Sequence, residues 1–343
     1  MIGVSRHGRQ ALPLLLLLLA LASFGGCKRG NEAVVGGRTA HQTAPQVSIC
    51  TGGTLAVLPL LAHERGDFAR QGIGVELIAK GDSQLALSAL FDGECDFATS
   101  GESTVAMTSF KRNDFVILAE IARAENANRI IARRDLGIRS AGDLRGKVVG
   151  VRRNSMSHFF LDLFLKKHGL GDGAVTVHFM EPGMQFDALE RGEIAAYSGT
   201  DELVLQGMRK LGDRAVVFSE PELCLNSTCL LVRRDFVESN RALVNKVLRA
   251  MLAAEEFADS RPEEVWDIVA RSRGMAKSDV QAMCQHQTQL VALRQSLLLT
   301  LEDRARWMME AGLAAKGPLP NLLDLLEPGP LKILKPSAVS LNR

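Results

Sequence analysis

Residues 47–79 constrain the fold more than any other part of the chain. A short apolar run ends at Cys50, a glycine-rich turn occupies residues 51–54, a helical pattern follows, and a second strand-like run begins at Val75. Such a strand–turn–helix–strand unit builds a parallel sheet, and parallel sheets bind ligands beyond the carboxyl ends of their strands, where helices present free N–H groups. The turn is therefore a candidate ligand loop, made of Thr51, Gly52, Gly53 and Thr54. The alternative is that its two glycines only form the turn.

A dinucleotide site fits this turn poorly. Its fingerprint is G-x-G-x-x-G with an acidic residue closing the second strand, whereas Gly52 and Gly53 are adjacent and Glu76 lies inside the second run. The histidines are scattered, and the cysteines form no paired C-x-x-C, so the chain has no zinc pattern. We predict no cofactor and no metal.

Residues 1–27 have the layout of a bacterial export signal. Arg6, His7 and Arg9 precede a short apolar run, and small residues lead up to Cys27. The apolar run is shorter than the ~20 residues that a spanning helix needs, so a permanent transmembrane anchor fits less well. Residues 28–45 are rich in Gly, Asn, Thr and Gln, which predicts a flexible tether.

The residues before Cys27 resemble the lipobox of bacterial lipoproteins, which implies that this cysteine is acylated. Phe24 stands where that box usually has leucine, so loss of Cys27 with the signal stays an alternative. The whole chain has 41 basic and 39 acidic residues, and Arg6 and Arg9 are the only charged residues of the signal. The exported part would then be electrically neutral, which disfavours binding of nucleic acid.

Five cysteines follow the signal: Cys50, Cys95, Cys224, Cys229 and Cys284. Cys224 and Cys229 could form a disulfide across an intervening loop in an oxidising compartment. Cys50 would end the first strand, and Cys95 would lie just before a neighbouring parallel strand. The two cysteines would then be several residues apart along the strands, at a rise of ~3.3 Å per residue. We expect that separation to exceed the ~7 Å Cα limit for a disulfide.

Three more polar loops follow predicted strands. Small hydroxyl residues beside glycine offer hydrogen-bond donors without filling a cleft. The alternative is that the loops only cap helices, and His158, in a first helical turn, fits a surface or capping role better than that of a base. The candidate ligand residues are Ser100, Gly101, Glu102 and Ser103, then Asn154, Ser155, Met156 and Ser157, and finally Ser198, Gly199, Thr200 and Asp201.

The alternation of strands and helices predicts an α/β fold of two lobes. We expect residues 46–132 and 230–343 to form lobe 1, with extra C-terminal helices that include residues 282–299, and residues 133–229 to form lobe 2. Two chain crossings would then form a hinge. A cleft between such lobes can close over a small polar molecule.

Five segments, in order, carry a family resemblance: LPLLAHERGDFARQGIGVELI, LSALFDGECDFATSGES, IRSAGDLRGKVVGVRRNSMSHFFLDLFLKKHGL, DALERGEIAAYSG and LLVRRDFVESNRALVNKVLRAMLAAEEFADSRPEEVWDIVA. The chain resembles the solute-binding proteins of ABC importers for nitrate, sulfonate and taurine, a group similar to the thiamine-precursor binding proteins. The resemblance implies a type II periplasmic-binding fold with parallel-sheet cores and a two-crossing hinge. It also implies a periplasmic or cell-surface monomer, lipid-anchored through Cys27, that delivers a solute to an ABC permease with a cytoplasmic ATPase.

By the same resemblance, the four polar loops are the ligand loops, and Asn126 lies near the hinge as a further contact. Family members commonly have an aromatic residue and a proline at residues 199–202, and many have glycine in place of Asn154. The match to any one substrate class is therefore poor.

The expected solute is small, polar, and anionic or zwitterionic. Helix N-termini favour an anionic group, whereas Glu102 and Asp201 would favour a cationic or hydrogen-bond-donating pole, unless both only cap helices. An exported ligand-binding sensor is the alternative function. An enzyme on the same fold fits less well, because Ser155 and His158 alone do not make a catalytic set.

Overall fold

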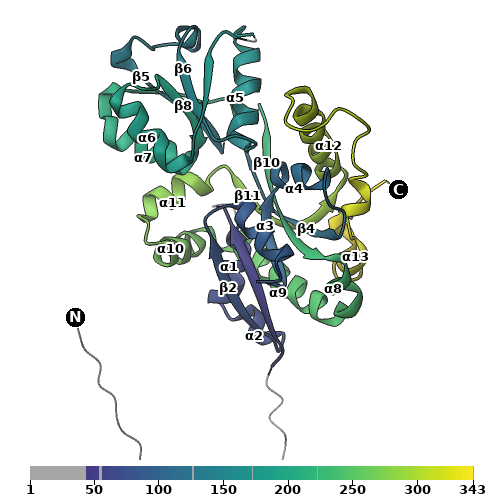
Figure 1. The fold of residues 1–343 in the computed structure, drawn as a ribbon. Coiled ribbons are helices and arrows are strands. Elements are labelled where there is room, and N and C mark those ends of the chain that lie inside the picture. The colour runs from purple at the N-terminus through teal and green to yellow at the C-terminus, as the bar shows by residue number, and fades with distance from the viewer. Residues whose placement is uncertain (1–43, 54–55, 126, 172, 222, 343) are drawn as a thin grey trace, which may run out of the picture. The chain divides into compact units, whose positions relative to one another are not determined.

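The computed structural model describes residues 44–342 apart from 54–55, 126, 172 and 222. Its strands form two separate mixed sheets (Figure 1). The first has the order β12-β11-β4-β10-β3-β1-β2 and the second the order β7-β6-β8-β5-β9. The strands of the first sheet are β1 (Gln46–Gly52), β2 (Gly74–Lys80), β3 (Phe97–Gly101), β4 (Phe115–Glu125), β10 (Leu225–Arg233), β11 (Gln287–Arg294) and β12 (Val339–Ser340). We call the part built on this sheet lobe 1.

The predicted strand–turn–helix–strand unit opens lobe 1. β1 pairs in parallel with β2 and with β3, and Ile49 lies opposite Leu77 and Phe97. The helix before β3 starts because Asp82 accepts hydrogen bonds from the N–H groups of Gln84 and Leu85, at 2.7 and 2.9 Å. The first helices of lobe 1 are α1 (Val57–Glu64), α2 (Asp67–Arg70), α3 (Ser83–Phe91) and α4 (Glu102–Ser109).

Gly52 lies where β1 meets the start of α3, and no side chain fits there. A Cβ atom on Gly52 would lie 2.5 Å from the carbonyl oxygen of Asp82. We therefore expect Gly52→Ala to lower the free energy of unfolding by about 1–3 kcal/mol in urea denaturation. Gly183→Ala is the matched control, since its Cβ would meet nothing within 4 Å. Equal stability of Gly52→Ala and wild type would contradict this close approach.

The second sheet and its helices form lobe 2. Its helices are amphipathic, and α5 buries Phe160 and Phe164 in the core of lobe 2, whereas Phe159 packs against Trp307. The strands are β5 (Asn128–Arg133), β6 (Val148–Val151), β7 (Thr176–Phe179), β8 (Ala196–Thr200) and β9 (Ala215–Phe218), and the helices are α5 (Met156–Lys167), α6 (Pro182–Arg191) and α7 (Asp201–Leu211).

The described chain passes between the sheets after β4 and again before β10, as the predicted hinge requires. β5 pairs antiparallel with β8 and β9, so Ile131 lies between Tyr197 and Val217 in the second sheet. The predicted limits of lobe 2, residues 133 and 229, therefore differ from the observed sheets, because lobe 2 already includes β5 and β10 already starts at Leu225. A short apolar strand has the same local pattern whichever sheet accepts it.

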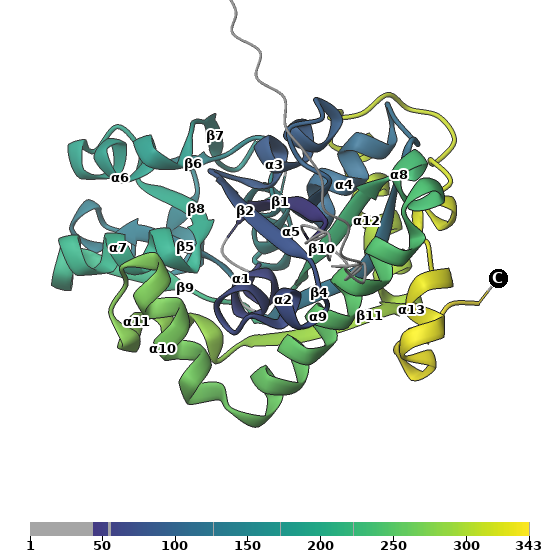
Figure 2. The ribbon, with the colours of Figure 1, turned by 90° about the horizontal axis from the view of Figure 1, so that it is seen from below.

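The C-terminal part adds helices to lobe 1, together with two strands. The predicted helix over residues 282–299 is wrong, because β11 lies between α11 and α12 and its residues 290–293 are buried in the sheet between β4 and β12. Figures 1 and 2 place α11 beside α7, where Arg209 and Asp279 form an ion pair at 2.7 Å. The helices of this part are α8 (Arg234–Ser239), α9 (Arg241–Ser260), α10 (Pro262–Arg273), α11 (Lys277–Cys284), α12 (Gln295–Glu310) and α13 (Gly329–Leu334). Short 3₁₀ turns occur in lobe 2, at Arg134–Leu136, Ala141–Leu144 and Gly212–Arg214, and in the C-terminal part, at Leu323–Leu325 and Pro336–Ala338. Within the described residues, none of the helices has the length and apolar character needed to cross a membrane.

The disulfide prediction is wrong in both directions. Cys50 and Cys95 form a disulfide, with their Cα atoms 5.9 Å apart. The distance expected between the two Cα atoms was too long, because it assumed an extended strand at Cys95. Cys95 instead precedes β3, in a bent segment. Cys224 and Cys229 are free thiols, since the chain between them runs extended into β10 and separates the two residues by roughly 16 Å at the usual rise.

Candidate functional site

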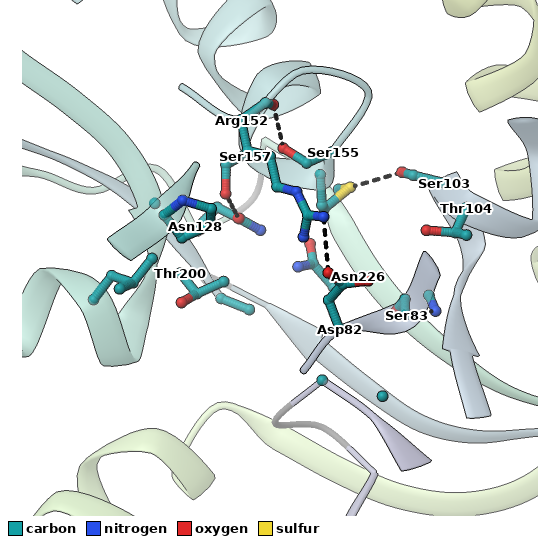
Figure 3. A pocket seen from close by; sticks show the side chains of 18 of the residues that line it. Asp82, Ser83, Ser103, Thr104, Asn128, Arg152, Ser155, Ser157, Thr200 and Asn226 are labelled. Atoms are coloured by element: carbon teal, nitrogen blue, oxygen red, sulfur yellow. Dashed lines mark hydrogen bonds and ion pairs between the residues drawn. The ribbon is translucent and has the colours of Figure 1, made fainter. Parts of the chain in front are cut away.

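A cavity of about 370 Å³ lies between the lobes (Figure 3). Its wall is formed by the first turns of α3 to α7, together with residues of β5, β10 and β11. The converging helix starts follow from the strand–loop–helix order of the sequence, which places these loops at the same edge of each sheet. The volume lies in the range of small-molecule sites.

The cavity brings together residues from all four predicted loops. Thr51 and Ser100 do not line it. Thr51 lies beside Gly52 on a strand, so its side chain points to the opposite face, and buried Ser100 donates to the carbonyl oxygen of Ser83 at 3.2 Å. Three further predicted residues, Cys27, Thr54 and Asn126, lie outside the described residues. The predicted residues in the wall are Gly52, Gly53, Gly101, Glu102, Ser103, Asn154, Ser155, Met156, Ser157, Ser198, Gly199, Thr200 and Asp201.

An ion pair joins the lobes across the cavity. Asp82 of lobe 1 accepts from the Arg152 guanidinium of lobe 2 at 2.8 Å, and both residues line the cavity (Figure 3). Burial acts to raise the pKa of Asp82, but hydrogen bonds from the Leu85 and Gln84 N–H groups and from Arg152 outweigh burial and lower it. The Ser103 hydroxyl also meets the Met156 sulfur across the cleft at 3.4 Å. Opening of the lobes must break these contacts.

Glu102 lies at the start of α4 with a carboxylate that is almost fully buried. It accepts from the Ser227 N–H at 2.7 Å and from the Ser103 hydroxyl at 3.3 Å, and the Nε of Arg304 lies 3.5 Å away. Burial raises the pKa of Glu102 above its ordinary value, although Arg304 and these hydrogen bonds oppose the shift. The carboxylate is therefore held within lobe 1 by its own chain.

Asp201 occupies the corresponding place at the start of α7. Its carboxylate lies 2.8 Å from the Nε of Arg129, and burial raises the pKa of Asp201 against the opposing effects of Arg129 and His286. Asp82, Glu102 and Asp201 thus each place a carboxylate at a helix start, and each has an arginine partner. Glu102 and Asp201 line the cavity, as predicted, but no side-chain cap hydrogen bond forms at the start of α4 or α7, whereas Asp82 caps α3.

Asn154 adopts a backbone conformation that favours glycine. Its φ of 57° lies in the left-handed region, which asparagine tolerates better than most residues because its short side chain bonds locally. Here Asn154 lines the cavity just before α5, and the carboxamide adds a polar group that glycine would lack. This geometry explains how asparagine can replace the glycine expected from the family resemblance.

His158 does not act on Ser155. The Ser155 hydroxyl donates to the Arg152 carbonyl at 2.7 Å and accepts from the His158 N–H at 3.2 Å, which are helix-cap contacts. The His158 imidazole lies between the rings of Phe179 and Trp307, at centroid distances of 5.0 and 5.2 Å, and burial lowers its pKa to about 4. The prediction gave His158 a surface or capping role: its N–H does take part in the cap of α5, whereas its imidazole is partly buried and not fully exposed on the surface.

Sequence reasoning missed several residues of the wall. Asp82 and Ser83 follow the second predicted strand, so the same strand–loop–helix rule could have found them. No local signal marks Asn226 or Gln287, which reach the cavity from strands far along the chain. Within the part of the chain that the structure describes, no group of three His, Cys, Asp or Glu residues could hold a metal ion.

Comparisons with known proteins agree with this geometry. The chain is 23% identical over 227 residues to a Brucella abortus protein described only as a binding protein, covering 64% of this chain and 69% of that one. It is 24% identical to the taurine-binding periplasmic protein of Escherichia coli, over 65% and 73% of the two chains. The crystal structure of the periplasmic aliphatic sulphonate binding protein SsuA from Escherichia coli superposes with a TM-score of 0.71 at 17% identity, over 82% of this chain and 92% of that chain.

This superposition confirms the predicted periplasmic-binding fold. The model of the NMT1/THI5-like family matches residues 57–265, which is more than half of the chain and includes both crossings between the lobes. The resemblance to the sulfonate and taurine group is confirmed as well. The chain therefore belongs to the NMT1/THI5-like family.

Proposed function

We propose that this protein is an extracytoplasmic solute-binding protein that captures a small polar solute and delivers it to an ABC permease driven by a cytoplasmic ATPase. The observation that carries the proposal is the cavity between two hinged lobes, with polar groups of both lobes in its wall. The names of relatives that bind taurine and sulphonates support the same role. The protein acts as a monomer and binds its solute without chemistry, in keeping with the helix-cap contacts of Ser155.

The solute is anionic or zwitterionic, and the protein meets it outside the inner membrane. The export layout of residues 1–27 supports this location, and acylation of Cys27 would tie the protein to the membrane through the tether of residues 28–45. Mass spectrometry of the mature protein from a bacterial host tests the anchor. A diacylglyceryl adduct on Cys27 is the expected result, and an unmodified N-terminus beyond residue 27 would contradict it.

Ligand binding should raise the thermal stability of the purified protein. A solute at 100 times its dissociation constant adds about 2.7 kcal/mol to the free energy of unfolding. A panel of anions, sulfonates, amino acids and aminopyrimidines is screened by differential scanning fluorimetry. Thr104 lines the cavity, so Thr104→Trp should fill it and remove the response, whereas Lys111→Trp, at an exposed position, should keep it. An unchanged response of Thr104→Trp would place the binding site elsewhere.

A further inference from the structure

Helix α5 of lobe 2 has two apolar faces, and each face packs in a different lobe. Phe160 and Phe164 lie in the core of lobe 2. Phe159 is 6% exposed and belongs to the core of lobe 1, and Met156 and Leu163 pack against that same core. The spacing of Met156, Phe159 and Leu163 places them on one side of the helix. A helix of one lobe is therefore embedded in the apolar core of the other.

Helix α12 of lobe 1 forms the other half of this contact. The Trp307 side chain is buried, and its ring makes edge-to-face contacts with His158 and Phe159, at centroid distances of 5.2 and 5.0 Å. The Trp307 Nε1–H donates to the Asp162 carboxylate at 3.0 Å. The Arg304 guanidinium stacks on the Phe159 ring at 3.8 Å. We call these five residues, which join α5 to α12, the anchor.

Two further contacts between the lobes are ion pairs that reach solvent. Arg209 of α7 pairs with Asp279 of α11 at 2.7 Å, and their side chains are 56% and 22% exposed. Arg152 pairs with Asp82 across the cavity at 2.8 Å, and both side chains are partly exposed. The apolar cluster on which α7 packs is formed, among the described residues, by side chains of lobe 2 alone. An exposed ion pair contributes several times less than a buried pair of aromatic rings, so these ion pairs break before the anchor does.

The anchor also lies beside the hinge. At the C-terminal cap of α5, the His168 ring contacts the Glu220 carboxylate at 2.9 Å, in the second passage of the chain between the sheets. In α12, Arg304 donates to the Leu225 carbonyl at 2.9 Å, where this passage enters β10. In a rotation about a hinge, a contact close to the axis moves less than a distant one. The position of the anchor and its apolar character therefore favour the same motion.

We propose that the anchor stays closed when the lobes open, so that the cleft opens by rotation about the contact of α5 with α12 and separates α7 from α11. The inference rests on the proposed solute-binding function, because an opening cleft serves a solute. The first turn of α5, residues 154–157, then moves less against lobe 1 than the first turn of α7, residues 200–202, and both turns line the cavity. A solute therefore meets a partly built wall near α5 before the wall at α7 closes on it.

Trp307 itself reports whether the anchor opens. The chain has two tryptophans, Trp266 and Trp307, so Trp266→Phe gives a parent protein in which Trp307 is the single indole fluorophore. A buried indole emits at short wavelength and is shielded from acrylamide, whereas an indole in water emits at longer wavelength and is quenched. Phe159→Ala in the parent calibrates the probe, because it removes a ring that contacts Trp307.

Charge reversal at the two ion pairs should open the cleft without any solute. An opening variant of the parent carries Arg152→Glu and Arg209→Glu, which place like charges opposite Asp82 and Asp279. Small-angle X-ray scattering of the full mature chain should give a radius of gyration larger by about 1 Å, on roughly 19 Å for a compact chain of this size. The emission maximum of Trp307 should show no shift from the parent, and acrylamide should quench it no more strongly.

A matched variant controls for the change of net charge. Arg145→Glu with Arg191→Glu makes the same change at residues whose partners lie within lobe 2, and should leave both readings as in the parent. A larger radius of the opening variant together with red-shifted, quenchable emission would overturn the proposal. An unchanged radius in a variant that folds by circular dichroism would overturn it as well, because the side of α7 and α11 would not be the one that yields. If the double substitution prevents folding, Arg209→Glu alone is measured with the same outcomes.

The two proposals fail in different ways. The comparison of the variants needs no solute, so it decides on the anchor even if no molecule of the panel binds, a result that would contradict solute binding alone. Any solute that does bind should, at saturation, return the radius of the opening variant toward that of the parent and leave the Trp307 emission unshifted. A shift of this emission on solute binding would keep the solute-binding function and overturn only the anchor.

Discussion

Replacing Cys50 and Cys95 together by alanine is expected to lower the free energy of unfolding by about 4 kcal/mol. The disulfide closes a loop over a sequence separation of 45 residues, and the loss of loop-closure entropy in the unfolded chain accounts for roughly this amount. The bond holds the start of β3 against β1, whose end leads to Gly52 at the cavity. Guanidinium denaturation of the oxidised wild type and the double variant measures the difference.

Two controls separate the bond from the side chains. Cys284→Ala removes a free thiol that is only partly buried and should change stability by less than about 1 kcal/mol. Dithiothreitol should lower the melting temperature of the wild type and leave that of the double variant unchanged. A wild type that melts at the same temperature with and without reductant, after thiol counting confirms reduction, would show that the bond does not stabilise the fold.

Arg304→Met should destabilise the protein by about 3–5 kcal/mol at pH 7, because it leaves a buried carboxylate without its cation. Arg304 is 4% exposed, its Nε lies 3.5 Å from Glu102, and its guanidinium stacks on Phe159 of lobe 2 at 3.8 Å. It also donates to the Leu225 carbonyl at 2.9 Å, where β10 begins. Methionine keeps most of the apolar contact area, so the loss reports mainly on the charge.

The stability lost in Arg304→Met should depend on pH, and the direction of this dependence follows from the pKa of Glu102. Burial raises the pKa of Glu102 above the ordinary value of 4.5, so the folded state holds this proton more tightly than the unfolded state does. The contribution of Glu102 to stability therefore falls as pH rises from about 4.5 through the folded pKa. Without Arg304 that pKa rises further, so the loss in Arg304→Met should be larger at pH 7 than at pH 4.5.

The double variant Arg304→Met with Glu102→Gln is the matched control. Glutamine keeps an acceptor for the Ser227 N–H and carries no charge, so the double variant should recover most of the stability lost by Arg304→Met and lose its pH dependence. If the double variant is no more stable than Arg304→Met at pH 7, the loss comes from packing around α12, and the assignment of an unpaired charge is wrong.

Local patterns in the sequence predicted the parts of the fold that are built locally. The strand–loop–helix order around residues 47–79 predicted the parallel pairing of β1 with β2 in the mixed sheet of lobe 1, and the polar loops at Gly101, Ser155 and Thr200 meet at the cavity as expected. They could be predicted because each loop is encoded by a few adjacent residues and parallel strands bring such loops to one edge. Capping of α3 by Asp82 also follows from its neighbours alone.

The sequence by itself thus determined two α/β lobes and the strand-end loops that face each other. It also predicted a location outside the cytoplasm. Only the tertiary structure decided that Cys50 reaches Cys95, that β5 joins the second sheet, that β11 is a strand, and that Asn226 and Gln287 reach the cavity. These features depend on contacts between residues far apart in the chain. A periodic pattern reports which face of an element is buried, but it carries no information about which distant segment covers that face.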